Sequence, residues 1–184
     1  MRKIMILPAT LLLLIRVAAA QETDFRVVTV IDAATLDAAM AVAPRDEVSD
    51  QPVVHVESAE GRLGLGVVHR PVIEPGGPVR GIQHHQQSEV YRVMAGAGVL
   101  VTSAGMSGAE SLDDEGFVVR NLTGPSSIGV INEPEQSQPI AKGDVVIIPA
   151  GVAHGFSEIT EPISYMVIRV DPERVVALKQ VSEE

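Results

Sequence analysis

Two stretches of this chain carry side chains that bind metal ions. Gln83, His84, His85 and Glu89 lie within seven residues of one another, and His154 stands in a second stretch, residues 143–156. Because the chain contains no cysteine, nitrogen and oxygen atoms would have to hold any metal. Imidazole together with carboxylate suits divalent iron, manganese, nickel or zinc. These residues predict a mononuclear metal site built from two separate segments.

Strand periodicity limits which of the neighbouring side chains can share one metal. On an extended strand, Gln83 and His85 point to one face and His84 points to the other. One metal can therefore bind Gln83 and His85 together, but it can bind both histidines only where a bulge intervenes. The first stretch would supply an imidazole, a carboxylate from Glu89 and a possible amide oxygen, and His154 would arrive from the second.

The elements that must position these residues are short strands. Between residues 52 and 170, runs rich in β-branched residues alternate with polar ones, and Gly or Pro separates nearly every run. One predicted strand spans residues 117–121. Helical patterns occur only near the ends, over residues 33–43 behind Asp32 as N-cap and over residues 172–180. This pattern predicts an all-β, antiparallel sandwich or barrel.

The predicted domains are an N-terminal arm (21–51), a barrel (52–171) and a C-terminal helical tail (172–184). A predicted strand over residues 25–31 opens the arm. The arm could pack on a neighbouring subunit or form a lid on its own barrel.

The first twenty residues have the pattern of a secretory signal peptide. Arg2 and Lys3 precede an apolar run, and the small residues 17–20 form a cleavage site. An uncleaved membrane anchor is the alternative, but the apolar core is short for a membrane span and Arg16 interrupts it. We expect cleavage after residue 20, with a secreted or periplasmic mature protein that has no membrane partner.

Composition excludes some partners. The chain has 24 acidic against 14 basic residues, a net charge of −10, which argues against binding to nucleic acid or to an anionic membrane surface. The absence of cysteine excludes disulfides, so the exported protein must be stabilised by its core. Its length is sufficient for one sizeable core.

Two spaced motifs make the chain resemble the cupin family. The first cupin motif, G-x5-H-x-H-x3-E-x6-G, corresponds to Gly77, Gln83, His85, Glu89 and Gly96 at the same spacing. The second, G-x5-P-x-G-x2-H-x3-N, corresponds to Gly143, Pro149, Gly151, His154 and Glu158. The resemblance implies a small antiparallel jelly-roll β-barrel whose metal ligands gather at one inner end.

The resemblance implies that His85, Glu89 and His154 bind a divalent transition metal. Gln83 stands where the motif has its first histidine, and its amide oxygen is a weaker, neutral ligand. It would serve as a labile fourth ligand, or His84 would replace it through a bulge, or the site would be degenerate. Glu158, in place of asparagine, lies outside the ligand set.

The resemblance constrains the function less than the fold, because cupins include oxygenases, isomerases, lyases and non-enzymatic binders. We expect a metal-dependent enzyme acting on a small oxygenated molecule, with Tyr91 or His69 as proton donor or acceptor. His69 would point into the barrel if its strand alternates. The alternatives are a non-catalytic binder of small molecules with a degenerate metal site, and an inert envelope component. Exposed barrel edges and the N-terminal strand favour a homodimer.

Overall fold

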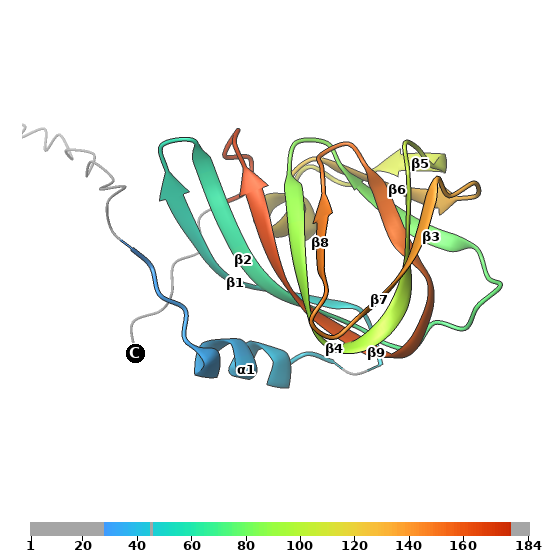
Figure 1. The fold of residues 1–184 in the computed structure, drawn as a ribbon. Helices are drawn as coiled ribbons and strands as arrows, with labels where there is room; N and C mark the ends of the chain where they lie inside the picture. The colour runs from blue at the N-terminus through green and yellow to red at the C-terminus, as the bar shows by residue number, and fades with distance from the viewer. Residues whose placement is uncertain (1–27, 45, 178–184) are drawn as a thin grey trace, which may run out of the picture.

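The computed structural model describes residues 28–44 and 46–177, and the predicted signal peptide lies outside them. Antiparallel strands make up most of this part of the chain (Figure 1). They are β1 (Ser49–Ser58), β2 (Gly61–Arg70), β3 (Val79–His84), β4 (Ser88–Ser103), β5 (Ser107–Ser111), β6 (Ser126–Ile131), β7 (Gln136–Ala141), β8 (Val145–Ile148) and β9 (Ala153–Asp171). Two helical segments accompany them, α1 (Ala33–Ala41) and the π-helix η1 (Val119–Thr123).

The long strands β4 and β9 run through both layers of the fold. The second half of β9 pairs with β2 and the first half of β4, whereas its first half pairs with β3 and the second half of β4. The β4–β9 register shifts between Val93 and Leu100, and Gly96 in this bend has a φ of 78°. A Cβ on Gly96 would lie 2.1 Å from the Pro162 carbonyl oxygen, so glycine is required here.

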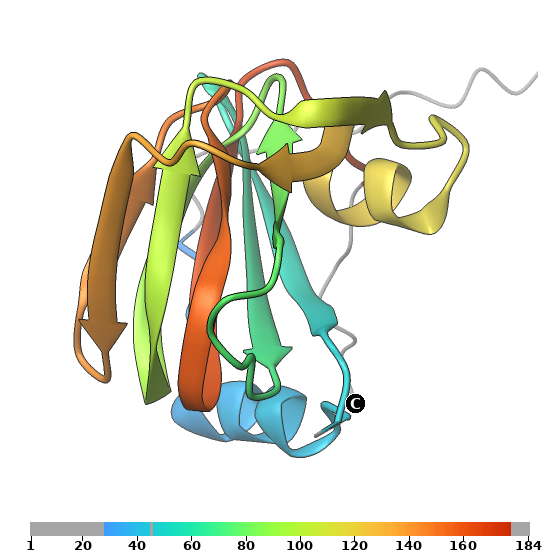
Figure 2. The same cartoon turned by 90° about the vertical axis from the view of Figure 1, so that its right-hand side faces the viewer.

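These bends fold one continuous sheet over on itself (Figure 2). One layer has the strand order β1-β2-β9-β4-β8, and the other has β5-β6-β3-β9-β4-β7. The inner faces of the layers enclose an apolar core that includes Tyr91, Val93, Ile163, Tyr165 and Val167. The predicted all-β, antiparallel barrel is confirmed.

The N-terminal helix forms as predicted, but the strand before it does not. Asp32 caps α1, since its Oδ1 accepts a hydrogen bond from the Thr35 amide at 2.8 Å. Residues 28–31, the described part of the predicted strand, make no strand pairing, and Val28 and Val30 are 83% and 82% exposed. Alternation favours an extended chain, but a strand also needs a neighbour, and this segment has none within the described chain.

The helix predicted over residues 172–180 does not form in its described part. Residues 172–177 form a turn without a helix, and the remainder of the prediction lies outside the described residues. The Asp171 carboxylate accepts hydrogen bonds from the amides of Val175 and Val176 at 3.0 and 3.1 Å. This local bonding gives the backbone an alternative to a helix.

A third correction concerns residues 117–121, which are helical rather than a strand. Val119 and Leu122 in η1 are 5% and 4% exposed, so helical spacing buries both side chains on one side. Packing therefore overrides the strand propensity of this valine-rich segment.

No helix in the described residues is both long enough and apolar enough to cross a membrane.

Candidate metal centre

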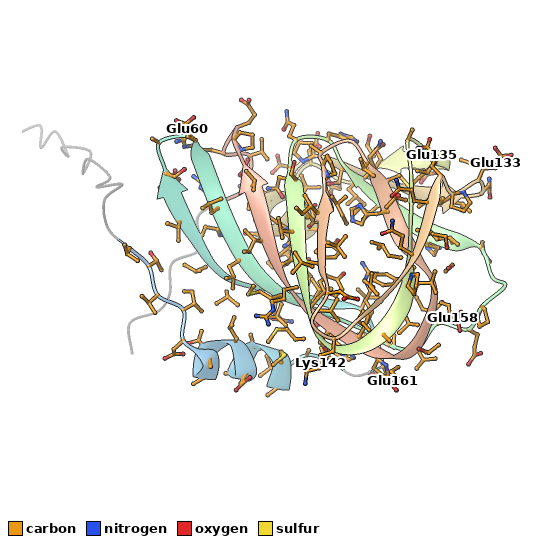
Figure 3. The ribbon with its side chains drawn as sticks, viewed as in Figure 1. Glu60, Glu133, Glu135, Lys142, Glu158 and Glu161 are labelled. Carbon is orange, nitrogen blue, oxygen red and sulfur yellow. The ribbon has the colours of Figure 1, made fainter. Side chains whose placement is uncertain are left out.

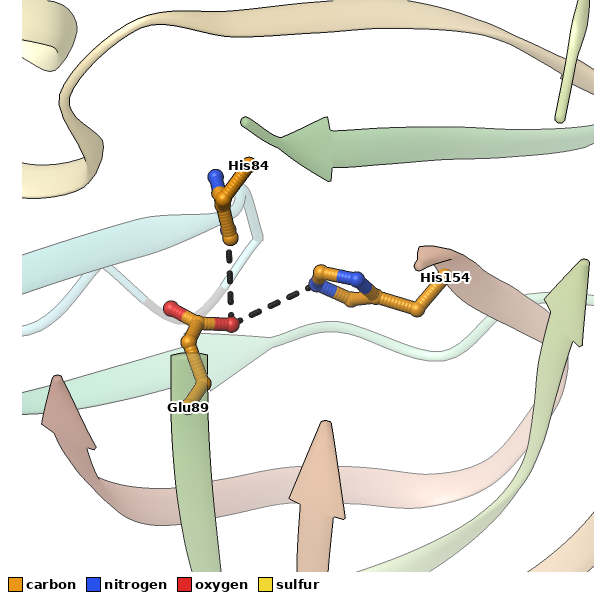
Figure 4. Close-up of side chains that lie close together, drawn as sticks. All are labelled: His84, Glu89 and His154. Atoms are coloured by element: carbon orange, nitrogen blue, oxygen red, sulfur yellow. Dashed lines mark ion pairs between the residues drawn. The ribbon is translucent and has the colours of Figure 1, made fainter. Parts of the chain in front are cut away.

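Three strands bring two imidazoles and one carboxylate together at an inner end of the barrel. His84 is the last residue of β3, Glu89 lies near the start of β4, and His154 lies near the start of β9. One ligand atom from each lies within 4.8 Å of the other two. Glu89 Oε2 is 3.3 Å from His84 Nε2 and 3.4 Å from His154 Nε2 (Figure 4). All three side chains are buried, with at most 4% exposed.

Hydrogen bonds at the far side of each imidazole direct its Nε2 toward the group. His154 Nδ1 lies 3.1 Å from the Val152 carbonyl oxygen, which can only accept. His84 Nδ1 lies 2.9 Å from Ser126 Oγ, whose own proton can go to the Gly124 carbonyl at 3.0 Å. An imidazole whose one ring proton is on Nδ1 presents an Nε2 lone pair, and here that lone pair would face the carboxylate. Metal-binding histidines are held in this way.

A cation placed between these atoms would satisfy them. Two lone pairs facing a carboxylate oxygen repel it unless a proton or a metal ion lies between. Burial lowers the pKa of His84 below its usual value, although Glu89 opposes the shift, so protonation is disfavoured there. The donor set of two nitrogens and one carboxylate oxygen therefore fits a divalent transition metal.

The other carboxylate oxygen of Glu89, Oε1, is bonded to an arginine. Arg169 Nε donates to Glu89 Oε1 at 2.8 Å, and the same guanidinium donates to both oxygens of Asp50 at 2.6 and 3.3 Å. Burial alone would raise the pKa of Glu89, but the charge of Arg169 opposes burial and the pKa lies well below its usual value. Glu89 is therefore an ionised carboxylate with one oxygen occupied and one facing the histidines.

Tyr91 adds a hydroxyl to the group. Its OH donates to Glu89 Oε2 at 2.7 Å and lies 3.1 Å from His154 Nε2. The ring stacks on Tyr165 with centroids 4.2 Å apart, which fixes its orientation. Burial, reinforced by the charge of Glu89, raises the pKa of Tyr91 well above its usual value, so the hydroxyl keeps its proton at neutral pH.

The predicted orientation of the adjacent histidines is corrected. The structure brings His84, not His85, to Glu89 and His154, whereas His85 is exposed and its Nε2 lies 3.0 Å from Ser127 Oγ. Alternation does separate the two histidines, but β3 ends at His84 and a bend at His85 and Gln86 follows. This bend breaks the periodicity, so the inward side of β3 could not be deduced by counting back from Glu89.

Gln83 also lies outside the group. Its Nε2 donates to the Gly151 carbonyl at 2.6 Å and more weakly to that of Ala104 at 3.4 Å. It is therefore on the face of β3 opposite His84, where it joins two loops. The structure therefore does not bring Gln83, a predicted metal ligand, to the group of His84, Glu89 and His154.

His69 faces away from the centre as well. In the β2–β9 register it pairs with Ser164, and its Nδ1 lies 2.9 Å from Ser164 Oγ. Its neighbour Val68 points into the core with Tyr91. Alternation puts His69 on the opposite, outer face, so the expectation that it lines the barrel is corrected.

The sequence patterns did not indicate Arg169, Asp50 or Ser126. A signal was available for Arg169, because alternation in β9 places it on the same face as Tyr165 and Val167, where a charged residue is unusual. No pattern distinguished Asp50 or Ser126, since both meet their partners through long-range strand pairing.

Both spaced motifs therefore meet at one inner end of an antiparallel barrel, where Glu89 comes from the first motif and His154 from the second. The chain has a cupin fold. No family model and no curated protein sequence matches it.

The solved structures that are similar to this chain are distant. BH2720 from Bacillus halodurans is 12% identical, with 87% of this chain and 94% of that chain covered, at a TM-score of 0.46. A Cupin 2 conserved barrel domain protein from Salinispora arenicola is 18% identical, with 72% and 83% covered, at 0.40. The DMSP lyase DddQ from Ruegeria pomeroyi is 17% identical, with 75% and 54% covered, at 0.41.

Proposed function

We propose that this cupin is an exported metalloenzyme that acts on a small oxygenated molecule. His84, Glu89 and His154 would hold one divalent iron, manganese, nickel or zinc ion, and Tyr91 would be the proton-transfer residue. The observation that carries the proposal is the convergence of two Nε2 lone pairs, one ionised carboxylate oxygen and one protonated hydroxyl. When bound, the metal would supply a Lewis acid that polarises a substrate oxygen.

The residues around the metal ligands suit proton transfer. Tyr91 holds its proton at Oη, where Glu89 and His154 are both within hydrogen-bond distance. Arg169 keeps Glu89 ionised and oriented. The burial of all these groups excludes bulk water, which strengthens their electrostatic interactions. Because lyases and isomerases depend on proton transfer, these two reaction types are favoured over an oxygenase.

A non-catalytic binder is the second candidate, and the close confinement of the group favours it. The cavity that borders His84, Glu89 and Tyr91 measures only about 60 Å³. This volume is well below the roughly 300–1,000 Å³ that sites for small molecules occupy.

A comparison of adjacent histidines tests the metal site. We expect the purified protein to contain one transition metal per chain by elemental analysis. His84→Ala should weaken metal binding by more than the roughly 10- to 100-fold that loss of a supporting residue costs, whereas His85→Ala should leave it unchanged. Absence of metal after incubation with iron, manganese, nickel and zinc salts would refute the site.

Catalysis and export are tested separately. Tyr91→Phe should retain the metal but lose turnover in a panel of small molecules followed by NMR. If the metal-loaded wild type turns over no compound in that panel, the non-catalytic binder is favoured.

Export predicts that the protein recovered from outside the cytoplasm lacks residues 1–20 by mass spectrometry.

A further inference from the structure

A second cavity, of about 770 Å³, lies between β7 and β8. Leu100, Ile140 and Ile148 provide buried apolar side chains in its lining, and Thr102, Gln136 and Gln138 provide neutral polar groups. Its volume falls within the range of about 300–1,000 Å³ that small-molecule sites occupy.

This cavity adjoins the candidate metal centre through strand pairing. Three of its lining residues are the direct strand partners of three residues of the centre: Thr102 of His154, Ile148 of Glu89, and Val146 of Tyr91. Partners in an antiparallel pair lie side by side with their side chains on the same face. A molecule in the cavity would therefore be one side chain away from the centre.

The charges that line the cavity have one sign. Among the described residues, the only charged side chains that line it are those of Glu135 and Asp144, and none of these lining residues is basic. One oxygen of each carboxylate accepts a backbone N–H, from Ala104 at 3.3 Å and from Ala141 at 2.8 Å, and the other oxygen makes no hydrogen bond within the described chain.

Side chains near the cavity do not reverse this charge. Figure 3 shows Glu133 beside Glu135 at one end of β7 and Lys142 at the other end. Lys142 lies in the turn between β7 and β8 and does not line the cavity.

We propose that this cavity is the substrate chamber and that it admits neutral or cationic small molecules and excludes anions. The proposal rests on the proposed function for the chemistry, but the charge selection belongs to the cavity itself. With no metal at the neighbouring centre, an anion entering the cavity would lose hydration and meet two carboxylates, and no basic side chain in the described lining would compensate. A cation would approach a free carboxylate oxygen at either end, and a neutral molecule could use the Gln136 and Gln138 amides.

Three probes of matched shape test the selection: choline, 3,3-dimethylbutan-1-ol and 3,3-dimethylbutanoate. Their dissociation constants are measured by ligand-observed NMR with the full mature protein after removal of metal by a chelator. We expect choline to bind at least as tightly as the alcohol, and the carboxylate to bind at least about tenfold more weakly than either. Equal or tighter binding of the carboxylate, or no binding of any probe, would overturn the proposal.

Variants that neutralise carboxylates test whether the discrimination against anions arises in the cavity. The double variant Glu135→Gln, Asp144→Asn keeps side-chain volume and hydrogen-bond acceptors. It should reduce the ratio of the dissociation constants of the carboxylate and choline at least about fivefold, without changing the dissociation constant of the alcohol. Glu161→Gln removes one exposed charge that does not line the cavity, and it should change nothing. If the double variant behaves like Glu161→Gln, the selection does not arise in the cavity.

Metal binding is measured on the same wild-type sample before chelation. A protein without metal that still discriminates among the probes would refute the proposed metalloenzyme and retain the chamber. A protein that binds metal but binds the three probes equally would refute the proposed chamber and leave the proposed metalloenzyme intact.

Discussion

Each oxygen of the Glu89 carboxylate has a different environment. Oε1 is bonded to Arg169, and Oε2 faces His84, His154 and Tyr91. Because Arg169 is itself fixed by Asp50, the carboxylate has little freedom to rotate. The buried arginine therefore acts as a positioning residue, which leaves one oxygen available to a metal.

Replacement of Arg169 tests this role. Arg169→Met should weaken metal affinity roughly 10- to 100-fold, because Glu89 loses the partner that keeps it ionised and oriented. It should also cost about 3–5 kcal/mol in the free energy of unfolding, since the buried carboxylate of Glu89 and the partly buried one of Asp50 lose their ion pair. Metal titration and denaturant unfolding measure the two effects.

Arg62 provides the matched control on the same layer. It pairs with Glu57, and both side chains are largely buried. Arg62→Met should lower stability and leave metal affinity unchanged. Asp50→Asn, which keeps the acceptor geometry, serves if Arg169→Met does not fold. Unchanged metal affinity in a folded Asp50→Asn or Arg169→Met variant would contradict the positioning role.

At the scale of elements, strand β3 decides which polar residues reach the metal centre. Its pairing with β6 places His84 opposite Ser126, and its pairing with β9 places Gln83 opposite Ala153. His84 then points inward, and Gln83 points to the loops that contain Ala104 and Gly151.

This arrangement makes Gln83 a structural residue. Gln83→His should not increase metal affinity, although it restores the cupin motif, because the new imidazole would lie on the outer face of β3. It should cost about 1 kcal/mol in the free energy of unfolding through loss of the bond to Gly151. A metal titration of Gln83→His beside wild type checks the first expectation, and tighter binding would show that this face can turn inward.

At the scale of the whole molecule, the outer face of the β1-β2-β9-β4-β8 layer is unusually apolar. Leu63, Val145, Ile147 and Val170 are 39–72% exposed on it. Strand pairing joins Leu63 to Val170 and Val90 to both Ile147 and Ile168. A broad exposed apolar face on a sheet favours association, so the homodimer stays a prediction that this face makes testable.

Charge placed on this face should separate the subunits. We expect Val145→Lys, Ile147→Lys to convert a wild-type dimer to a monomer in light-scattering measurements, because each lysine would be buried without a partner. Phe117→Lys changes an apolar side chain that is 64% exposed in the helical segment, and it should leave the dimer intact. A monomeric wild type at micromolar concentration would contradict the prediction.

The sequence by itself determined the fold class and part of the centre. Alternating runs and Gly-containing turns are local properties of the chain, so the antiparallel barrel could be predicted from them. The spacing of the two cupin motifs was sufficient to select Glu89 and His154, and the Asp32 cap of α1 depends only on neighbouring residues.

Only the tertiary structure decided which histidine completes the group. His84 and His85 are chemically identical neighbours, and their assignment depends on where β3 ends and which face it turns toward β4. The Asp50–Arg169–Glu89 chain similarly joins residues from three strands. Such contacts arise from long-range strand register, which no local periodicity encodes.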